Sequence, residues 1–264
     1  MIIDGKKIAA DIYQETADLV HQCPRTPVMA AITCAPNFET KKYLDLKVKK
    51  AAEVGITLRV IELPATVTTQ EAIDCVRAVA PQVDGIVVQL PFPPHIAREQ
   101  VLAVVPPEKD PDGFSYGAVE GACLPPVVGA IVEIAQRHNI TFDQKHVVVL
   151  GQGRLVGAPV ATFLNASGAI VQTFTEADEH PREALLRADV LVTGIGKAHF
   201  VTPDMVPNGI AIFDAGTSED GGVVVGDVHP DVAEKAALFT PVPGGIGPIT
   251  VALLLRNLVS LIRQ

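Results

Sequence analysis

The chain has 264 residues, of which 48% are hydrophobic and 19% are charged. This amount of apolar material supports a packed core and excludes an intrinsically disordered chain. The formal net charge of -9 disfavours a surface that binds nucleic acid or an anionic membrane, but it allows a local basic site for a small anionic ligand.

Cysteines and apolar runs set further bounds. The four cysteines form no CxxC pair and no histidine pattern completes a metal site, so we expect reduced thiols and no bound metal. No apolar run reaches the roughly 18 residues of a membrane span, and the first residues contain no apolar signal core. These features predict a cytoplasmic protein. The cysteines are Cys23, Cys34, Cys75 and Cys123.

Helical and strand patterns alternate in the first half of the chain. The spacing of apolar residues predicts helices over 7–22, 40–55 and 69–82. Apolar runs predict strands over 27–35, 56–64 and 83–91. Because these strands show little polar alternation, we expect a parallel sheet that is buried on both faces and connected by helical crossovers.

A second series follows a loop-rich junction within 115–139, a segment that ends in a helix. A strand, a glycine-rich turn and a helix are predicted over 146–167, and a last helix at about 249–263. Further strands are expected over 169–175, 188–196 and 209–216.

These elements predict an α/β fold with two domains. The first is an N-terminal α/β domain of residues 1–120 plus 249–264, to which the C-terminal helix returns. The second is a Rossmann-type dinucleotide-binding domain of residues 121–248.

The stretch VVVLGQGRLVGAP is a glycine-rich turn between a predicted strand and a predicted helix. Gly151, Gly153 and Gly157 would let the backbone approach a pyrophosphate, and the helix N-terminus offers free N–H groups. The GxGxxxG spacing is one residue longer than the commonest dinucleotide fingerprint, and a tight structural turn is the alternative. Glu176, about 20 residues further on, is suited to the ribose hydroxyls of NAD and would repel the extra phosphate of NADP, unless it is an ordinary surface acid.

Candidate catalytic groups lie in three short stretches. In YLDLK, Tyr43 and Lys47 share one helix face, where an aromatic ring can stack on a flat ligand and a desolvated lysine can act as acid or base. The alternative is a solvated basic face. Gln89 ends a predicted strand, and open α/β sheets bind ligands at this end of their strands. The alternative is that Gln89 only caps the strand. In EKDPDGF, turn chemistry explains Asp110 and Asp112, yet one of them could bind the amidine-like edge of a pterin.

Together these stretches resemble one family, the bifunctional methylenetetrahydrofolate dehydrogenase/cyclohydrolases, over nearly the whole chain. The matching stretches are IIDGKKIA, YLDLKVKKAAEVGI, VDGIVVQLPFP, KDPDGF, VVVLGQGRLVGAPV, ADVLVTGIGKAHFV, GDVHPDV and TPVPGGIGPIT. The resemblance implies a two-domain enzyme, usually a homodimer, with a folate substrate between the domains and NAD or NADP on the Rossmann domain. It implies oxidation of methylenetetrahydrofolate by hydride transfer, then hydrolysis of the methenyl product to formyltetrahydrofolate. These reactions belong to one-carbon metabolism and supply purine biosynthesis.

The resemblance also implies roles for individual residues. It places the family lysine at Lys47, the stacking tyrosine at Tyr43, the glutamine that contacts the lysine at Gln89 and the pterin-binding aspartate at Asp112. These four are the expected catalytic residues. The other expected substrate-binding residues are Leu90, Pro91, Pro243, Gly244 and Gly245. The expected cofactor-binding residues are Gly151, Gln152, Gly153, Arg154, Leu155, Val156, Glu176, Thr193, Gly194, Gly196, Gly247 and Thr250.

The sequence departs from the family at the nucleotide turn. Gln152 and Gly153 stand where the family usually has arginine and serine, and Thr175 and Glu176 align with a usual His-Ser pair. Both changes remove groups suited to a phosphate, so we expect NAD to be used at least as well as NADP. Arg154 argues against this expectation, since it lies in the turn and could reach a phosphate.

Two loops near the expected folate site also carry expectations. The segment after DGF is short, and LPPV in the loop Leu124–Val128 replaces the family's PCTP motif, which leaves the shape of the folate or nicotinamide pocket open. In PVPGGIGPIT, residues 243–245 lack bulk, so the backbone can pass close to the folate ring. Pro248 suits the first turn of the last helix. A bulky residue at Gly244 should then damage folate turnover more than stability.

Three alternatives stay open. The first is a monofunctional dehydrogenase with weak cyclohydrolase activity, because the loop after DGF is altered. The second is a nucleotide-binding protein that has lost catalysis, which the four matched polar groups argue against. The third is a hydroxy-acid dehydrogenase, which would need a catalytic histidine or arginine near the cofactor. His199 and His229 are available, but we expect them to be unpaired surface residues.

Overall fold

The computed structural model describes residues 1–175, 178 and 181–263. The chain divides into two compact units, Met1–Ala9 with Pro126–Thr250, and Ala10–Pro125 with Val251–Gln264. We call them the five-stranded unit and the three-stranded unit after their main sheets. The domains predicted from the sequence differ from these units at three places. They put residues 1–9 and 249–250 in the first domain and residues 121–125 in the second. The assignment of functions to domains therefore stays a prediction.

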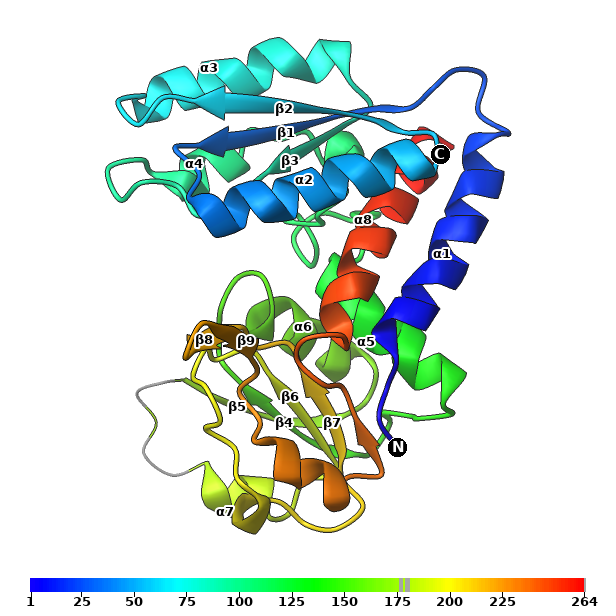
Figure 1. Ribbon diagram of the computed structural model, residues 1–264, viewed down its shortest axis with the longest axis vertical. Helices are drawn as coiled ribbons and strands as arrows, with labels where there is room; N and C mark the ends of the chain where they lie inside the picture. The colour runs from blue at the N-terminus through cyan, green and yellow to red at the C-terminus, as the bar shows by residue number, and fades with distance from the viewer. Residues whose placement is uncertain (176–177, 179–180, 264) are drawn as a thin grey trace. The chain divides into compact units, whose positions relative to one another are not determined.

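The three-stranded unit is a parallel sheet in the order β2-β1-β3, with helices on both faces (Figure 1). One face packs against α3 and α4, and the other against α2 and the second part of α8. Its strands are β1 (Val28–Cys34), β2 (Thr57–Leu63) and β3 (Gly85–Val88). Its helices are α2 (Phe38–Glu53), α3 (Thr69–Val79) and α4 (Arg98–Leu102), with the 3₁₀ turns η1 (Ala80–Gln82) and η2 (Pro107–Lys109). The boundary between the units falls within α1 (Gly5–Val20) and α8 (Ile246–Ile262).

Local sequence explains where these helices begin. The Asn37 side chain accepts a hydrogen bond from the backbone N–H of Thr40 at 2.8 Å and so caps α2. Thr68 and Glu71 form a reciprocal capping box at the start of α3. The expectation that all three strands are buried is wrong for β2, where Val60 is 43% exposed. β2 and β3 are both edge strands, but β3 is buried throughout, whereas β2 carries polar residues such as Arg59 and Glu62 and is largely exposed.

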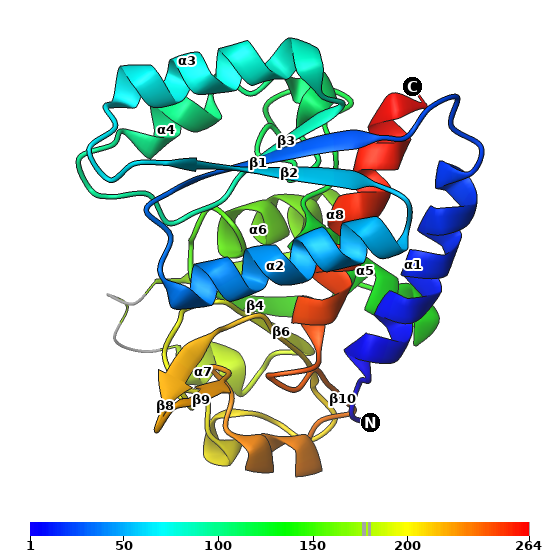
Figure 2. The ribbon, with the colours of Figure 1, turned by 45° about the horizontal axis from the view of Figure 1, so that its top comes forward.

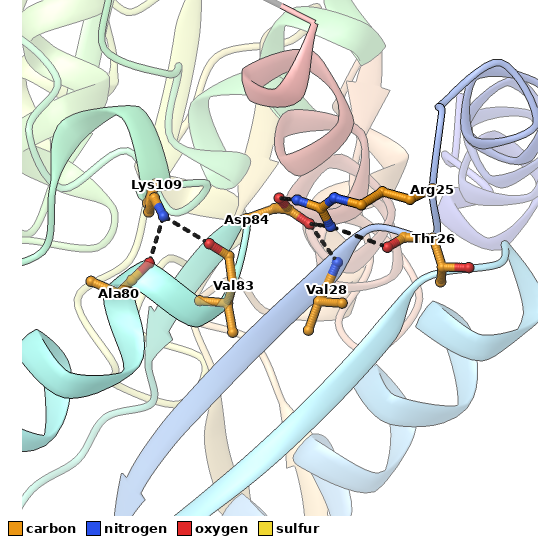
Figure 3. Close-up of polar contacts among 7 residues, drawn as sticks. All are labelled: Arg25, Thr26, Val28, Ala80, Val83, Asp84 and Lys109. Atoms are coloured by element: carbon orange, nitrogen blue, oxygen red, sulfur yellow. Dashed lines mark hydrogen bonds and ion pairs between the residues drawn. The ribbon is translucent and has the colours of Figure 1, made fainter.

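A charged cluster supports the N-terminal edge of this sheet, where β1 and β3 begin (Figure 3). The Asp84 carboxylate accepts two hydrogen bonds from the Arg25 guanidinium and one, at 2.8 Å, from the backbone N–H of Val28. Lys109 donates to two carbonyl groups just before β3. Burial raises the pKa of Asp84, but the hydrogen bonds and the charges of Arg25 and Lys109 outweigh it, so that the pKa lies below its ordinary value.

The five-stranded unit holds a parallel sheet in the order β10-β7-β6-β4-β5. One face packs against α7, while α6 lies against β4 and β5, and α5 packs on α6. The strands are β4 (His146–Leu150), β5 (Ile170–Phe174), β6 (Val190–Thr193), β7 (Ala211–Asp214), β10 (Leu238–Phe239) and a hairpin of β8 (Ser218–Asp220) and β9 (Val223–Val225). The helices are α5 (Pro126–Arg137), α6 (Gly157–Ala166) and α7 (Arg182–Leu185), with the 3₁₀ turns η3 (Pro203–Met205) and η4 (Pro230–Glu234).

The order of strands marks a ligand-binding position in this unit. The chain leaves β4 for β5 on one side and then returns to β6 on the other side. Sheets of this order bind ligands outside the carboxyl ends of the strands at this switch point. The first residues of the chain also belong here, since Ile2 bridges to Phe239 of β10. Figure 2 shows the N-terminus beside β10. No helix in the described parts of the chain is long and apolar enough to cross a membrane.

Candidate functional sites

Lys47 and Gln89 meet at the C-terminal edge of the three-stranded sheet. Lys47 projects from α2, is only 6% exposed, and its Nζ donates to Gln89 Oε1 at 2.9 Å. Gln89 directly follows β3, and its Nε2 donates to the carbonyl of Leu90 at 2.9 Å. This second bond fixes the amide so that its oxygen faces the lysine. The structure thus brings together two residues that the sequence placed 42 positions apart.

Tyr43 completes this group from one turn earlier in α2. The Lys47 Nζ lies 4.8 Å from the centre of the Tyr43 ring, within the range of a cation–π contact. The ring is 37% exposed, so part of it is available to a flat ligand. Leu90 and Pro91 follow Gln89 in the loop after β3 and are partly buried and exposed, respectively.

Asp110 and Asp112 lie in the turn that follows η2. Burial raises the pKa of the Asp112 carboxyl to about 6; the positive charge of Lys47 opposes this shift and the negative charge of Asp110 adds to it. Asp110 is 2% exposed, and its Oδ2 accepts from the N–H and hydroxyl of Ser115 at 3.1 and 3.3 Å. Its Oδ1 has no partner among the residues that the structure describes. The turn therefore holds two carboxyl groups: Asp110 keeps one oxygen without a partner in the described part of the chain, and Asp112 feels the charge of Lys47.

The altered loop Leu124–Val128 supports this turn. Asn257, in α8, donates from Nδ2 to the carbonyls of Pro111 and Leu124, both at 2.9 Å. Gly113 has φ +68°, and a Cβ there would lie 2.4 Å from the carbonyl oxygen of Cys123. Sequence reasoning missed Asn257, although a lone asparagine in the apolar stretch VALLLRNLVSLI was a usable signal.

The three glycines of the expected nucleotide turn differ in whether the fold itself requires glycine at that position. Gly151 has φ +97°, and a Cβ on Gly157 would lie 1.9 Å from the Gly151 carbonyl oxygen, so the fold itself requires both. A Cβ on Gly153 would meet nothing within 4 Å, so open space adjoins this position. Gln152, Arg154 and Leu155 are exposed on the same turn and Val156 directly precedes α6.

A cavity of about 510 Å³ lies at the carboxyl ends of β4, β5 and β6 in this unit. Its lining is Leu150, Phe174, Thr175, Asp178, Pro181, Ile195, Gly196, Lys197 and Phe200. This mixture of apolar walls and a few polar groups, next to a glycine turn and the N-terminus of α6, fits a dinucleotide. Glu176, the predicted ribose contact, lies outside the described residues. Asp178 lines the cavity instead and accepts a hydrogen bond from the Thr175 hydroxyl at 2.8 Å.

The other predicted cofactor residues are placed as follows. Thr193 is fully buried at the end of β6, and its hydroxyl donates to Asp227 at 2.7 Å. Gly194 packs against Val156, whereas Gly196 has φ +74° and lines the cavity. Gly247 lies in the first turn of α8, and the Thr250 hydroxyl donates to its carbonyl at 2.7 Å. These cofactor contacts stay predictions.

The structure of the turn Pro243–Gly245 changes what we expect of a substitution at Gly244. The Gly244 carbonyl accepts from the N–H of Gly5 at 2.9 Å, and a Cβ on Gly245 would lie 2.6 Å from the carbonyl oxygen of Pro241. A Cβ on Gly244 would meet nothing within 4 Å, but φ is +109°, a conformation that side chains other than glycine rarely adopt. A bulky residue at Gly244 should therefore reduce stability as well as turnover.

His199 and His229 are not unpaired surface residues. Both are partly buried, and their rings pack edge to face with centroids 5.3 Å apart. The expectation was wrong because the loop after β6 and the segment before η4 lie side by side, as the bridge Val201–Val228 shows.

Comparison with known proteins shows which family has this fold and these two domains. The family described as tetrahydrofolate dehydrogenase/cyclohydrolase matches residues 3–112 with its catalytic domain and residues 125–264 with its NAD(P)-binding domain. The bifunctional protein FolD of Protochlamydia amoebophila is 36% identical over 97% of this chain and 96% of its own length.

Two solved structures show the same similarity. The bifunctional FolD of Campylobacter jejuni superposes with a TM-score of 0.95 and 30% identity over 100% of this chain and 98% of that chain. FolD of Trypanosoma brucei, complexed with NADP and an inhibitor, superposes with a TM-score of 0.93 and 32% identity over 100% of this chain and 97% of that chain. The chain therefore belongs to the tetrahydrofolate dehydrogenase/cyclohydrolase family.

Proposed function

We propose that Lys47, positioned by Gln89, is the acid–base group in the second of the two reactions that this enzyme catalyses. These are the NAD(P)-dependent oxidation of methylenetetrahydrofolate and the hydrolysis of methenyltetrahydrofolate. The observation that carries the assignment is the 2.9 Å hydrogen bond between a lysine that is 6% exposed and an amide at the end of β3. A lysine removed from water and held in one place is suited to proton transfer.

The hydrolysis needs a proton acceptor and then a proton donor. A water oxygen forms a bond to the methenyl carbon while the water loses a proton, which Lys47 Nζ takes up. The hydroxyl of the resulting adduct then loses its proton to solvent as the carbon–oxygen double bond forms, one carbon–nitrogen bond breaks, and the leaving nitrogen gains the proton that Lys47 took up. Gln89 Oε1 positions the lysine throughout. We assign Tyr43 to stacking on the folate and Asp112 to hydrogen bonds with the amidine-like edge of the pterin.

We propose that the nicotinamide nucleotide binds at the carboxyl edge of the five-stranded sheet. The turn at Gly151–Gly153, the first turn of α6 and the cavity beside Lys197 would hold it. When bound, the nicotinamide accepts the hydride; the protein's part is to orient it and exclude water. Enzymes of this family use NAD or NADP. For this chain we propose that NAD is used at least as well, because Gln152 replaces a phosphate-binding arginine and Asp178 adds a negative charge to the cavity.

One assay tests these assignments together. Purified protein is mixed with methylenetetrahydrofolate and either NAD or NADP, and absorbance follows the methenyl product as it forms and decays. We expect formation with both nucleotides, at least equal efficiency with NAD, and decay faster than the spontaneous rate. A product that forms but decays only spontaneously would contradict the cyclohydrolase role of Lys47. A much greater catalytic efficiency with NADP would contradict the nucleotide preference.

We further propose a homodimer, a folate domain of residues 1–120 plus 249–264, a nucleotide domain of residues 121–248, and a cytoplasmic location. The family resemblance supports the first three, and the four free cysteines support the last. Light scattering of the purified chain measures the oligomeric state. A monomer at micromolar concentration would contradict the dimer, and recovery in a membrane or secreted fraction would contradict the location.

A further inference from the structure

Two buried acids, Asp214 and Asp227, have no role in the site described above. Asp214 ends β7 and is 1% exposed; Asp227 follows β9 and is fully buried. Buried carboxyl groups are costly unless they are well hydrogen-bonded. The bonds that these two accept lead directly to the wall of the nucleotide cavity.

Asp227 holds the segment that follows β6. Its carboxylate accepts from the Thr193 hydroxyl at 2.7 Å, from the Ile195 N–H at 2.9 Å and from the Lys197 N–H at 2.8 Å. Gly196, between the last two donors, has φ +74°. The segment therefore wraps around a single carboxylate. Ile195, Gly196 and Lys197 are the residues by which this segment lines the cavity.

Asp214 in turn holds the segment that carries Asp227. It accepts backbone N–H bonds from Gly216 at 2.9 Å, Val228 at 3.0 Å and Asp227 at 3.3 Å. Burial raises the pKa of Asp214 to about 7; the N–H of Val228 opposes this shift and the charge of Asp227 adds to it. The two acids thus tie the ends of β6 and β7 to the segment after β9.

Two glycines make room for this arrangement. A Cβ on Gly216 would lie 2.1 Å from Asp227 Cγ, and a Cβ on Gly226 would lie 2.1 Å from Asp214 Oδ2. Neither carboxylate could keep its position beside a larger residue. The positions of the two acids are therefore specified by backbone as well as by hydrogen bonds.

We propose that Asp227 is a positioning residue for the nicotinamide nucleotide, holding residues 195–197 as one wall of the binding cavity, with Asp214 holding Asp227 in place. Asp227 acts through the backbone and does not contact the nucleotide. It also places Lys197, whose Nζ lies 4.8 Å from the centre of the Phe200 ring, another cavity residue. This inference rests on the proposed nucleotide site.

The test is Asp227→Asn in the full-length enzyme. One acceptor oxygen becomes an NH₂ group that faces N–H donors, so the wall loses its shape. We expect the Kd of NADH and NADPH, measured by their fluorescence on binding, to rise at least about tenfold. The cyclohydrolase reaction needs no nucleotide and uses Lys47 in the three-stranded unit. Its rate should stay within about twofold of wild type.

Two further variants make the result specific. Thr193→Val removes a single bond to Asp227 and should weaken nucleotide binding in the same direction by a smaller factor, even if Asp227→Asn fails to fold. Asp84→Asn removes a partly buried, hydrogen-bonded acid from the other unit and should lower Tm without changing nucleotide Kd.

Three results would overturn the proposal. One is an unchanged nucleotide Kd in folded Asp227→Asn, or in Thr193→Val where Asp227→Asn does not fold. Another is an equal loss of nucleotide binding and cyclohydrolase activity in Asp227→Asn. The last is that the wild-type chain binds neither NADH nor NADPH, which would remove the proposed nucleotide site itself and this inference with it.

Discussion

The two edges of the three-stranded sheet each carry charged groups, but the groups are bonded to different extents. At the N-terminal edge, Asp84 accepts three hydrogen bonds and Lys109 donates to two carbonyls. At the C-terminal edge, Lys47 donates to Gln89, and Asp110 keeps one oxygen without a partner in the described part of the chain. Both edges thus carry a lysine and an aspartate near β3, and only their bonding differs.

The pKa values show the consequence of this difference. Hydrogen bonds and positive charges hold the pKa of Asp84 below its ordinary value, whereas burial raises that of Asp112 to about 6. A carboxyl group whose bonds are already made by the protein stabilises the fold. A carboxyl group that is desolvated but not fully bonded retains capacity for a ligand. The comparison therefore separates a structural edge from a binding edge within one sheet.

The largest effect expected at the binding edge is that of Lys47→Met. Because the variant removes the proton-transferring Nζ, the cyclohydrolase rate should fall at least about 100-fold. Nucleotide binding and Tm should change little, since methionine can occupy the same buried volume. Stopped-flow decay of methenyltetrahydrofolate and calorimetric melting measure the two properties.

Lys109→Met is the matched change at the structural edge. It leaves two carbonyl groups without their donor and should destabilise the protein by about 1–3 kcal/mol while hydrolysis continues. The comparison would fail if Lys47→Met kept its cyclohydrolase rate, or if Lys109→Met lost activity without loss of Tm.

Most of the fold could be predicted from local patterns. The apolar stretch around Met29 and the capping box of Thr68 and Glu71 locate β1 and α3 without any tertiary information. The exposure of β2 was missed, although Arg59 and Glu62 in its sequence were a usable signal that the all-apolar β3 lacks. β10 has only two residues, and its pairing with β7 and with Ile2 is long-range. Nothing in a short window of sequence indicates such contacts.

The site was predictable only where residue types carry chemistry by themselves. Spacing put Tyr43 and Lys47 on one helix face, and the family resemblance added Gln89 and Asp112. Residues that act by holding others, such as Asn257 and Asp227, look like ordinary polar residues until their partners are known. Their partners lie tens of residues away along the chain, so no spacing rule connects them.

Asp112 gives the next largest effect, on the pH dependence of folate binding. If its carboxylate binds the pterin, protonation competes with the substrate, so KM for methylenetetrahydrofolate should rise as pH falls through about 6, by up to about tenfold per pH unit. Asp112→Asn should show a raised KM that no longer changes between pH 5 and 8. A wild-type KM that is flat across this range would show that Asp112 does not bind the substrate as a carboxylate.

A smaller effect is expected for Asp84→Asn, and it concerns stability. The folded pKa of Asp84 lies below its ordinary value, so its stabilising contribution is present above that value and is lost as pH falls through the folded pKa. The variant should lose about 1–3 kcal/mol of unfolding free energy at pH 7 and become equal to wild type in acid. Turnover at pH 7 should not change. Urea unfolding at several pH values tests this, and a loss that persists unchanged to pH 2 would point to a packing defect instead.

The smallest effect has the opposite sign and is the stability of Asp112→Asn without folate. Because the folded pKa of Asp112, about 6, lies above its ordinary value, its contribution is complete below the ordinary value and is lost as pH rises through about 6. The asparagine amide stays neutral at every pH, so the variant keeps this stability. At pH 8 it should therefore be more stable than wild type, by about 1 kcal/mol after allowance for solvent screening. At pH 4 the two proteins should unfold alike. If Asp112→Asn is less stable than wild type at pH 8, as Asp84→Asn is expected to be, then Asp112 is a structural acid and the two edges of the sheet do not differ in kind.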